Sequence, residues 1–325
     1  MSLWDWFQNN ESMLSGIAAA LVIGGAVVTI GRLFIVKIFR SEEKPKKITL
    51  NQLSSPSPHE IRFANSDGVK IAYNVQGRPA PTIIVSPGII SNLHVSSNLP
   101  PIKNTMSMFA KFARVINFDK RGQGLSDPVS RVANISERVR DIEAVALETT
   151  KDPFFLMGIS EGGPMSIQFA VENPDRVKGL ILFGTTPRFL RSDDYPIGLS
   201  ERALSTVGTN WGDATARDIL FPSISRDTMD DDTYKGFEKL LADRRSIIQI
   251  VEYMKKLDVR DILPKVSCPT LILHFSGDLA VPVRMGRYLA DKIPNSHFME
   301  IAGVDHCDLG NSPDAIDRVR AFINN

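Results

Sequence analysis

The amino-acid sequence predicts an α/β fold with a mostly parallel central sheet flanked by helices. Short apolar runs of strand length alternate with segments of helical spacing over most of residues 59–325, a pattern typical of parallel βαβ units. This stretch has the size of one large domain. A third observation is the segment GISEGG at residues 158–163, which we expect to form a tight turn between a strand and a helix.

The turn at residues 158–163 has the pattern G-x-S-x-G, with Ser160 at its centre. The apolar run 153–157 before it has strand length, and the segment 164–170 after it has helical spacing. Strand, turn and helix in this order are the context of a nucleophile elbow, in which glycines make room for a serine held in a strained turn. Because the pattern arises by chance in such a chain with a probability of roughly 0.1, further catalytic residues must be found downstream.

Two later loops contain the partners that a serine nucleophile requires. The run 269–275 is typical of a buried strand and leads into a turn with Asp278, and the run 297–301 is typical of the last strand and leads into a loop with His306. A serine needs a base to accept its proton, and the base needs a carboxylate that fixes its tautomer and stabilises its charge. The order Ser, acid, His is the one expected after a nucleophile elbow. We therefore predict that Ser160, Asp278 and His306 form a catalytic triad.

Other acidic and histidine residues are assigned structural or surface positions. Asp305 and Asp308 flank His306, but neighbours in sequence rarely reach the far ring nitrogen, so we place both at the surface. His274 and His297 lie in predicted strands and are assigned to packing or to the surface. No paired His or Cys spacing indicates a metal site, and we predict neither a metal nor a cofactor.

The loop after an earlier strand predicts an oxyanion hole. Residues 60–74 contain a hairpin signal at Gly68, and the next strand, 82–85, leads into a loop with Ile89. Where a nucleophile elbow is present, this loop supplies one backbone amide for the oxyanion, and the residue after the nucleophile supplies the other. We therefore predict the backbone N–H groups of Ile89 and Glu161 as donors, each lowering the barrier by about 3 to 4 kcal/mol.

The remaining domain elements surround these loops. A strand at 114–118 leads into the glycine-rich, charged loop 119–127, to which we assign a structural role beside the site. Residues 135–149 have helical periodicity, and 179–184 is typical of a strand. Between residues 187 and 262 the alternation of strands and helices stops, so we predict an insertion that covers the site as a cap and contributes to an apolar pocket.

The amino-terminal region predicts a membrane anchor. No charged residue occurs from Met13 to Gly31, and this run would span about 28 Å as a helix, close to the roughly 30 Å hydrocarbon core of a bilayer. We predict a tail and a single transmembrane helix within residues 1–40, with the helix over 13–31 and extending at most to residue 39. The polar, proline-containing segment 41–58 is predicted to be a linker to the domain at 59–325.

The residues around this run favour a membrane anchor over a signal peptide or a buried core helix, and they predict the orientation of the protein in the membrane. Asp5 and Glu11 stand where a signal peptide has basic residues, and sparse polar residues around the run disfavour a buried core helix. Basic side chains follow the run, so the positive-inside tendency predicts a single-pass protein whose domain faces the cytoplasm. These basic residues are Arg32, Lys37, Arg40, Lys44, Lys46 and Lys47.

Composition excludes some classes of function. The chain has 38 basic and 37 acidic residues, so it lacks the basic excess that would favour a nucleic-acid partner. Its two cysteines, Cys268 and Cys307, are too few for a disulfide scaffold. We predict a small-molecule acyl substrate and a membrane as partners, and the sequence does not indicate an oligomeric state.

From residue 59 onward the chain resembles the α/β-hydrolase-fold serine hydrolases. Three segments, residues 91–93 (SNL), 118–127 (FDKRGQGLSD) and 158–165 (GISEGGPM), resemble hydrolase domains that are fused to some adenylate cyclases and transcriptional regulators. Two features depart from that resemblance, because Pro87 stands where many relatives have histidine and no cyclase or DNA-binding segment follows. A serine at position 160, where haloalkane dehalogenases and epoxide hydrolases have aspartate, disfavours those two chemistries.

The predicted function is a membrane-anchored serine hydrolase that cleaves carboxylic esters, in the carboxylesterase and lipase class EC 3.1.1. An acyl-enzyme on Ser160 would be the intermediate. Two alternatives stay open. One is a slow or non-catalytic sensor of an acyl ligand, and the other is a hydrolase of lactone, amide or carbon-carbon bonds.

Overall fold

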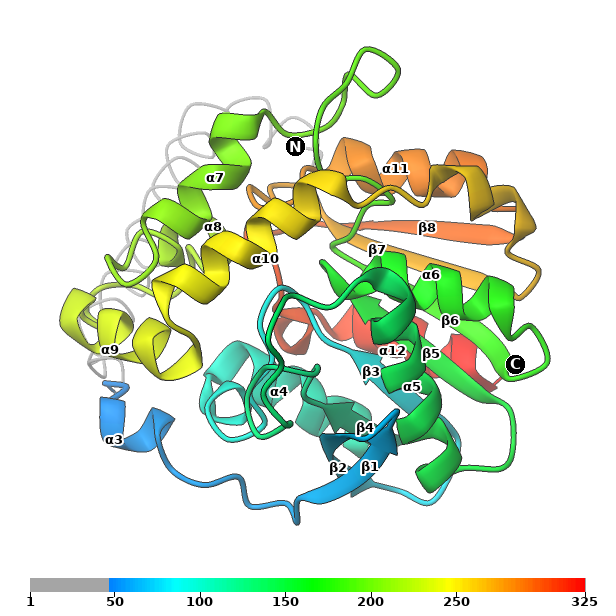
Figure 1. The fold of residues 1–325 in the computed structure, drawn as a ribbon, viewed down its shortest axis with the longest axis horizontal. Coiled ribbons are helices and arrows are strands. Elements are labelled where there is room, and N and C mark those ends of the chain that lie inside the picture. The colour runs from blue at the N-terminus through cyan, green and yellow to red at the C-terminus, as the bar shows by residue number, and fades with distance from the viewer. Residues whose placement is uncertain (1–46, 325) are drawn as a thin grey trace, which may run out of the picture. The chain divides into compact units, whose positions relative to one another are not determined.

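The computed structural model describes residues 47–324 (Figure 1). The predicted membrane-spanning segment 13–31 and the predicted linker before residue 47 lie outside the described residues. Within residues 47–324, no helix combines the length and the apolar character needed to cross a bilayer. The transmembrane helix and its orientation therefore stay predictions from the sequence.

Eight strands form a sheet in the order β1-β2-β4-β3-β5-β6-β7-β8. β2 pairs antiparallel with β1 and with β4, and the pairs from β4 onward are parallel, as predicted for the α/β-hydrolase fold. The carboxyl ends of the parallel strands consequently meet at one edge. The strands are β1 (Arg62–Ser66), β2 (Val69–Gly77), β3 (Thr82–Ser86), β4 (Arg114–Phe118), β5 (Phe154–Ile159), β6 (Val177–Phe183), β7 (Thr270–Phe275) and β8 (Ser296–Ile301).

Helices cover both faces of this sheet (Figure 1). α5, α6 and α11 pack on one face through an apolar cluster that includes Ile142, Ile167 and Leu289. α4 and α12 pack on the opposite face through a second cluster that includes Phe109 and Val319. The helices are α4 (Pro100–Ala110), α5 (Ile135–Thr149), α6 (Gly162–Glu172), α11 (Val283–Lys292) and α12 (Pro313–Asn324).

The beginnings of two helices show how far the sequence determines them. α5 begins at a capping box, in which the side chains of Asn134 and Glu137 each accept a hydrogen bond from the other residue's backbone N–H. This helix has the predicted bounds. α4 was not predicted, because it begins at Pro100 and Pro101, residues that also mark turns but that are well tolerated in a first helical turn.

An insertion of four α-helices separates β6 from β7. Its two ends lie side by side, since the Val259 N–H donates to the Pro187 carbonyl at 3.0 Å and Arg188 forms an ion pair with Asp258 at 2.6 Å. The insertion has an apolar core of its own around Trp211, and we call it the cap. Its helices lie within the predicted range 187–262. They are α7 (Glu201–Thr209), α8 (Arg217–Leu220), α9 (Asp231–Leu241) and α10 (Arg244–Lys256).

The amino-terminal end of the described chain packs against the cap. A short helix, α3 (Leu50–Leu53), contacts α9, and Leu53 is fully buried. The N–H of Ile48 donates to the carbonyl of Thr228 at 2.8 Å. Residues 41–58 were predicted to be a linker. From Ile48 onward the chain instead packs on the cap, because its few apolar side chains are buried there.

Candidate active site

Ser160 lies in the turn between β5 and α6, with a backbone φ of 52°. This left-handed conformation is unfavourable for a residue with a side chain and is typical of a nucleophile elbow. The Ser160 N–H donates to the Phe183 carbonyl at 3.0 Å, and Thr185 Oγ1 donates to the Ser160 carbonyl at 2.5 Å. Both bonds fix the turn to the end of β6, where Ser160 is 7% exposed.

Two glycines allow the close approach that this turn requires. A Cβ atom on Gly158 would lie 2.8 Å from Ser166 Oγ, and one on Gly162 would lie 2.3 Å from the Ser86 carbonyl oxygen. Both distances are far below van der Waals contact, so a side chain at either position would displace α6 from β5 or β3. The glycines of the motif therefore have the steric role that the sequence predicts for them.

Asp278 and His306 lie in the loops after β7 and β8 and are joined by a hydrogen bond. His306 Nδ1–H donates to Asp278 Oδ2 at 2.7 Å. The other carboxylate oxygen, Oδ1, accepts the backbone N–H groups of Ala280 and Val281, each at 2.9 Å. His274 is fully buried behind this carboxylate, and its Nε2 donates to the Val281 carbonyl at 2.6 Å. The carboxylate is thus held so that one oxygen faces His306.

The electrostatics of this pair favour the charged carboxylate and a basic imidazole. Burial opposes the charge on Asp278, but the nearby His306 and the hydrogen bonds from His274 and His306 outweigh it and lower the pKa of Asp278 to about 2. Burial likewise opposes the charged form of His306. The charge of Asp278 and its hydrogen bond outweigh that effect and raise the pKa of His306 above its ordinary value.

Ser160 and His306 approach the same piece of backbone but are not hydrogen-bonded. Ser160 binds the Phe183 carbonyl, and a Cβ atom on the next residue, Gly184, would lie 3.2 Å from His306 Cε1. His306 Nε2 is buried and has no hydrogen-bond partner within residues 47–324. The structure thus brings Asp278 and His306 together and leaves the third contact open. Such contacts are often long without substrate and shorten in the reacting complex.

The two predicted oxyanion donors lie on either side of the elbow. Ile89 follows Gly88, on which a Cβ atom would lie 3.2 Å from Ser160 Cβ, so this loop passes directly beside the nucleophile. Glu161 follows Ser160 and precedes α6. No backbone hydrogen bond in the described part of the chain uses the N–H of Ile89 or Glu161. Both N–H groups are therefore without a backbone acceptor in this part of the chain, and their role as oxyanion donors stays a prediction.

A buried cation contacts both segments that contain the predicted oxyanion donors. Lys120 Nζ donates to the Gly88 carbonyl at 2.5 Å and to the Ile89 carbonyl at 3.3 Å, and it forms an ion pair with the Glu161 carboxylate. Arg138 binds the other oxygen of Glu161 at 2.9 Å. Burial lowers the pKa of Lys120 to about 8, with Glu161 acting in the opposite direction. The 119–127 loop was predicted to have a structural role, and Lys120 is the residue of this loop that makes these contacts.

The Glu161 side chain was not predicted to belong to this network, since only its backbone N–H was assigned a role. An acidic residue directly after a buried strand and turn is itself a signal that a buried cation lies nearby. The side chains of Lys120, Arg138 and Glu161 are all almost completely buried. Their mutual pairing offsets the cost of removing three charges from water.

The surface assignment of Asp305 and Asp308 is wrong. Asp305 is 7% exposed and Asp308 is 4% exposed. Asp305 Oδ1 accepts the N–H of Ser223 at 2.9 Å, and the Ser223 hydroxyl also donates to this carboxylate. The next residue, His306, donates its backbone N–H to the Leu220 carbonyl at 2.9 Å. The loop of the predicted base is therefore attached to the cap.

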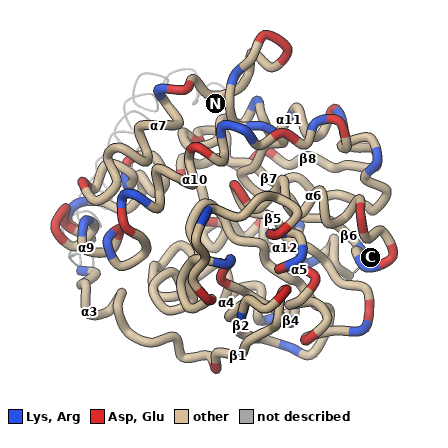
Figure 2. The backbone as a smooth tube through the Cα atoms, viewed as in Figure 1, with Lys and Arg blue, Asp and Glu red and all other residues tan. Residues whose placement is uncertain are grey.

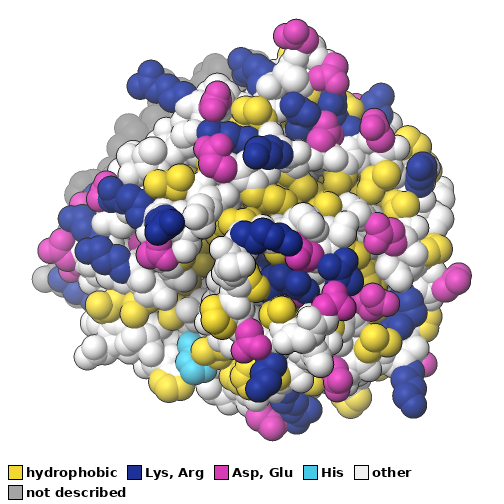
Figure 3. All heavy atoms as spheres, viewed as in Figure 1, with side chains coloured by type: hydrophobic (Ala, Val, Ile, Leu, Met, Phe, Trp, Pro, Cys, Tyr) yellow, Lys and Arg dark blue, Asp and Glu magenta, His cyan; other side chains and the backbone are white. Residues whose placement is uncertain are grey.

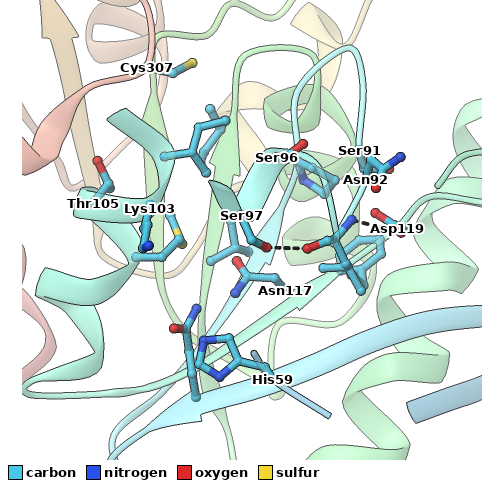
Figure 4. A pocket seen from close by; sticks show the side chains of 18 of the residues that line it. His59, Ser91, Asn92, Ser96, Ser97, Lys103, Thr105, Asn117, Asp119 and Cys307 are labelled. Atoms are coloured by element: carbon cyan, nitrogen blue, oxygen red, sulfur yellow. Dashed lines mark hydrogen bonds between the residues drawn. The ribbon is translucent and has the colours of Figure 1, made fainter. Parts of the chain in front are cut away.

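A cavity of about 490 Å³ adjoins the elbow (Figure 4). Its wall includes Gly88, Ile159, Phe183 and Cys307, which are near neighbours in sequence of Ile89, Ser160, Gly184 and His306. The rest of the wall comes largely from the segment between β3 and α4 and from α4 itself. This cavity is large enough for a small organic molecule.

Comparisons with known proteins agree with this fold. A family described as serine aminopeptidase S33 matches residues 102–310, more than half of the chain. The chain is 24% identical over 248 residues to karrikin insensitive 2 receptor IA of Petunia hybrida, which covers 72% of this chain and 86% of that protein. It is 24% identical over 160 residues to a pimeloyl-acyl-carrier-protein methyl ester esterase of Chromobacterium violaceum, covering 47% of this chain and 63% of the esterase.

Solved structures support the same fold. An esterase from Exiguobacterium antarcticum superposes with a TM-score of 0.67 at 20% identity, covering 81% of this chain and 99% of that chain. The predicted relation to hydrolase domains fused to cyclases or regulators stays a prediction. The family match spans the elbow, Asp278 and His306. The chain therefore belongs to the serine aminopeptidase S33 family of serine hydrolases with the α/β-hydrolase fold.

Proposed function

We propose that the protein is a cofactor-independent hydrolase of carboxylic esters. Ser160 is the nucleophile, His306 the general base and Asp278 the residue that orients His306. The observation that carries the proposal is the 2.7 Å hydrogen bond between Asp278 and His306 at the sheet edge where Ser160 stands in its left-handed turn. Basic and acidic residues are interspersed over the described chain (Figure 2), which suits a substrate selected by shape and apolar contact.

The reaction begins with attack of Ser160 Oγ on the ester carbonyl carbon while His306 Nε2 accepts the hydroxyl proton. The carbonyl oxygen becomes an oxyanion, which the N–H groups of Ile89 and Glu161 stabilise. The bond between carbon and the alcohol oxygen then breaks, and His306 returns the proton to the leaving alcohol. Water attacks the acyl-enzyme by the same route, with His306 as base, and releases the acid and free Ser160.

Covalent labelling tests this proposal on the unaltered protein. A fluorophosphonate probe phosphonylates an activated serine, so we expect one modified residue, Ser160, when the labelled protein is digested and its peptides are analysed by mass spectrometry. Ester turnover should also decrease in proportion to the fraction of protein that is labelled. Labelling at another serine, or ester turnover that persists after complete labelling of Ser160, would rule out the assigned nucleophile.

A second candidate function is a receptor that binds an acyl ligand and turns it over slowly or not at all. The observation in its favour is the similarity to a Petunia hybrida protein that is named as a receptor, at 24% identity over 72% of this chain. The two functions differ in stoichiometry. Many product molecules per protein support the hydrolase, whereas one retained ligand per protein without product supports the receptor. Lactone, amide and carbon-carbon substrates belong in the same assay, because the proposed steps apply to any polarised carbonyl.

We also propose that residues 13–31 anchor the protein in a membrane with residues 59–325 on the cytoplasmic side. The support is the uncharged run and the basic residues after it. The full chain should remain with membranes after alkaline carbonate washing, and the double variant Val22→Asp, Val27→Asp should be released. Release of the unaltered chain, or protection of the domain from protease on the far side of sealed vesicles, would contradict the anchor or its orientation.

A further inference from the structure

The cavity beside the elbow has two chemically different ends (Figure 4). In this view Cys307 lies at the top and His59 at the bottom, with Asn117 between them. The end near Ser160 is lined by apolar side chains of β3, α4, β5 and β6, namely Val85, Met106, Ile159 and Phe183. A hydrocarbon chain that starts at the nucleophile would therefore contact apolar atoms first.

The opposite end contains side-chain amides on the interior of the sheet. Asn117 of β4 stands directly opposite Asn74 of β2 in the strand register, and its Nδ2 donates to Asn74 Oδ1 at 3.4 Å. Asparagine is disfavoured in strands, and an interior strand ordinarily has apolar residues on a face covered by a helix. Neighbouring positions on this face obey that rule, since Val115 and Ile83 are fully buried. The two asparagines break it, and one of them, Asn117, lines the cavity. Such local exceptions are expected at binding sites.

The amides at this end have capacity for further hydrogen bonds. Within residues 47–324, Asn117 Oδ1 and the side chains of Gln76 and His59 make no recorded hydrogen bond, and all three residues line the cavity. Two charged residues also line the wall. Lys103 is exposed on α4. Asp119 Oδ2 accepts the backbone N–H groups of Leu125 and Leu93, at 2.9 and 3.2 Å, whereas Asp119 Oδ1 is buried without a hydrogen-bond partner in residues 47–324.

We infer that this cavity binds the acyl part of the substrate, and that the preferred acyl chain is an aliphatic segment ending in an uncharged hydrogen-bonding group such as a ketone or amide. The inference rests on the proposed ester hydrolysis. His306 must protonate the leaving alcohol, so the alcohol lies on the His306 side, towards the cap. The acyl carbon lies beside the oxyanion loop, whose Pro87 and Gly88 line the cavity.

The test compares p-nitrophenyl esters that share one leaving group and differ in the acyl chain: acetate, hexanoate and 5-oxohexanoate. For the unaltered protein we expect kcat/KM to rise from acetate to hexanoate and again to 5-oxohexanoate. Asn117→Leu keeps a similar size and removes the amide, so the ratio of 5-oxohexanoate to hexanoate should fall about tenfold. Met106→Trp fills the apolar end, so the ratio of hexanoate to acetate should fall at least as much.

The control is Asn104→Leu, the same substitution on the exposed side of α4 outside the cavity, which should leave both ratios unchanged. Fluorophosphonate labelling of each variant shows that its active site is folded. Equal ratios in Asn117→Leu and the unaltered protein, with turnover retained, would refute the polar end of the acyl site. If Met106→Trp changed kcat/KM among acetate esters that differ in the alcohol, and not among esters that differ in the acyl chain, the acyl assignment would be overturned. If no ester is turned over and Ser160 is not labelled, the hydrolase proposal itself fails and this inference falls with it.

Discussion

Ser160→Ala is expected to lower kcat for ester hydrolysis by about 10⁶-fold, because no other group in the proposed mechanism can form the acyl-enzyme. The oxyanion donors and the substrate cavity remain in place, so weak catalysis above the rate in water should persist. Relief of the left-handed strain at position 160 does not follow, since alanine also has a Cβ atom. The melting temperature should therefore change little.

The matched control for this substitution is Ser205→Ala on α7 of the cap, which removes a hydroxyl far from the elbow in sequence. This variant should retain turnover and labelling. The measurement is steady-state hydrolysis of a p-nitrophenyl ester by purified protein, with the labelling stoichiometry as the count of active sites. Turnover by Ser160→Ala within tenfold of the unaltered protein would refute Ser160 as the nucleophile.

Asp278→Asn is expected to lower kcat about 10⁴-fold while the fold is preserved. An amide can donate to His306 Nδ1 and so stabilise the tautomer with its proton on Nε2, which cannot accept the proton of Ser160. The amide also removes the negative charge that stabilises the imidazolium in the transition state. Asp291→Asn, an exposed carboxylate of α11, is the control and should keep full activity.

The pH dependence of the unaltered protein and of Asp278→Asn is a second test of the contact between Asp278 and His306. Only neutral His306 can act as a base, so kcat/KM should fall as pH decreases through the pKa of His306. Because Asp278 raises that pKa, the acid limb of the unaltered protein should have its midpoint above 6.5, the ordinary value for histidine. In Asp278→Asn the midpoint should move to lower pH, since burial without the carboxylate favours the neutral ring. An unchanged midpoint would show that Asp278 does not act on His306.

Much of the fold could be predicted from the sequence because its strands are short apolar runs bounded by turn residues. β4 and β7, for example, lie where the runs at 114–118 and 269–275 predict them. α12 was not predicted, although the buried residues Ala315, Ile316, Val319 and Ile323 have helical spacing in the sequence. The arrangement of the cap helices could not be predicted, because tertiary contacts decide which helix faces pack together and local sequence patterns do not show them.

The candidate site shows a similar division between local and distant information. The Ser160 turn, Asp278 and His306 could be located because each follows a recognisable strand. Asp305 was misplaced because its partner, Ser223, is 82 residues away on the cap. The grouping of the three catalytic candidates stays a prediction, and the substitutions above test it.

Part of the molecular surface near the cap is apolar. On the face drawn in Figure 3, hydrophobic side chains gather in a band that runs from α10 towards α6.

The attachment of the His306 loop to the cap limits how freely such a protein can be recombined. Exchanging caps between relatives is an obvious route to new selectivity, on the assumption that the catalytic body is an independent module. Here the carbonyl at Leu220 and the hydroxyl at Ser223 position the backbone that bears the base. A transplanted cap that lacks these two anchors would alter the chemistry as well as the choice of substrate, so chimeras should retain the α8 segment of the host.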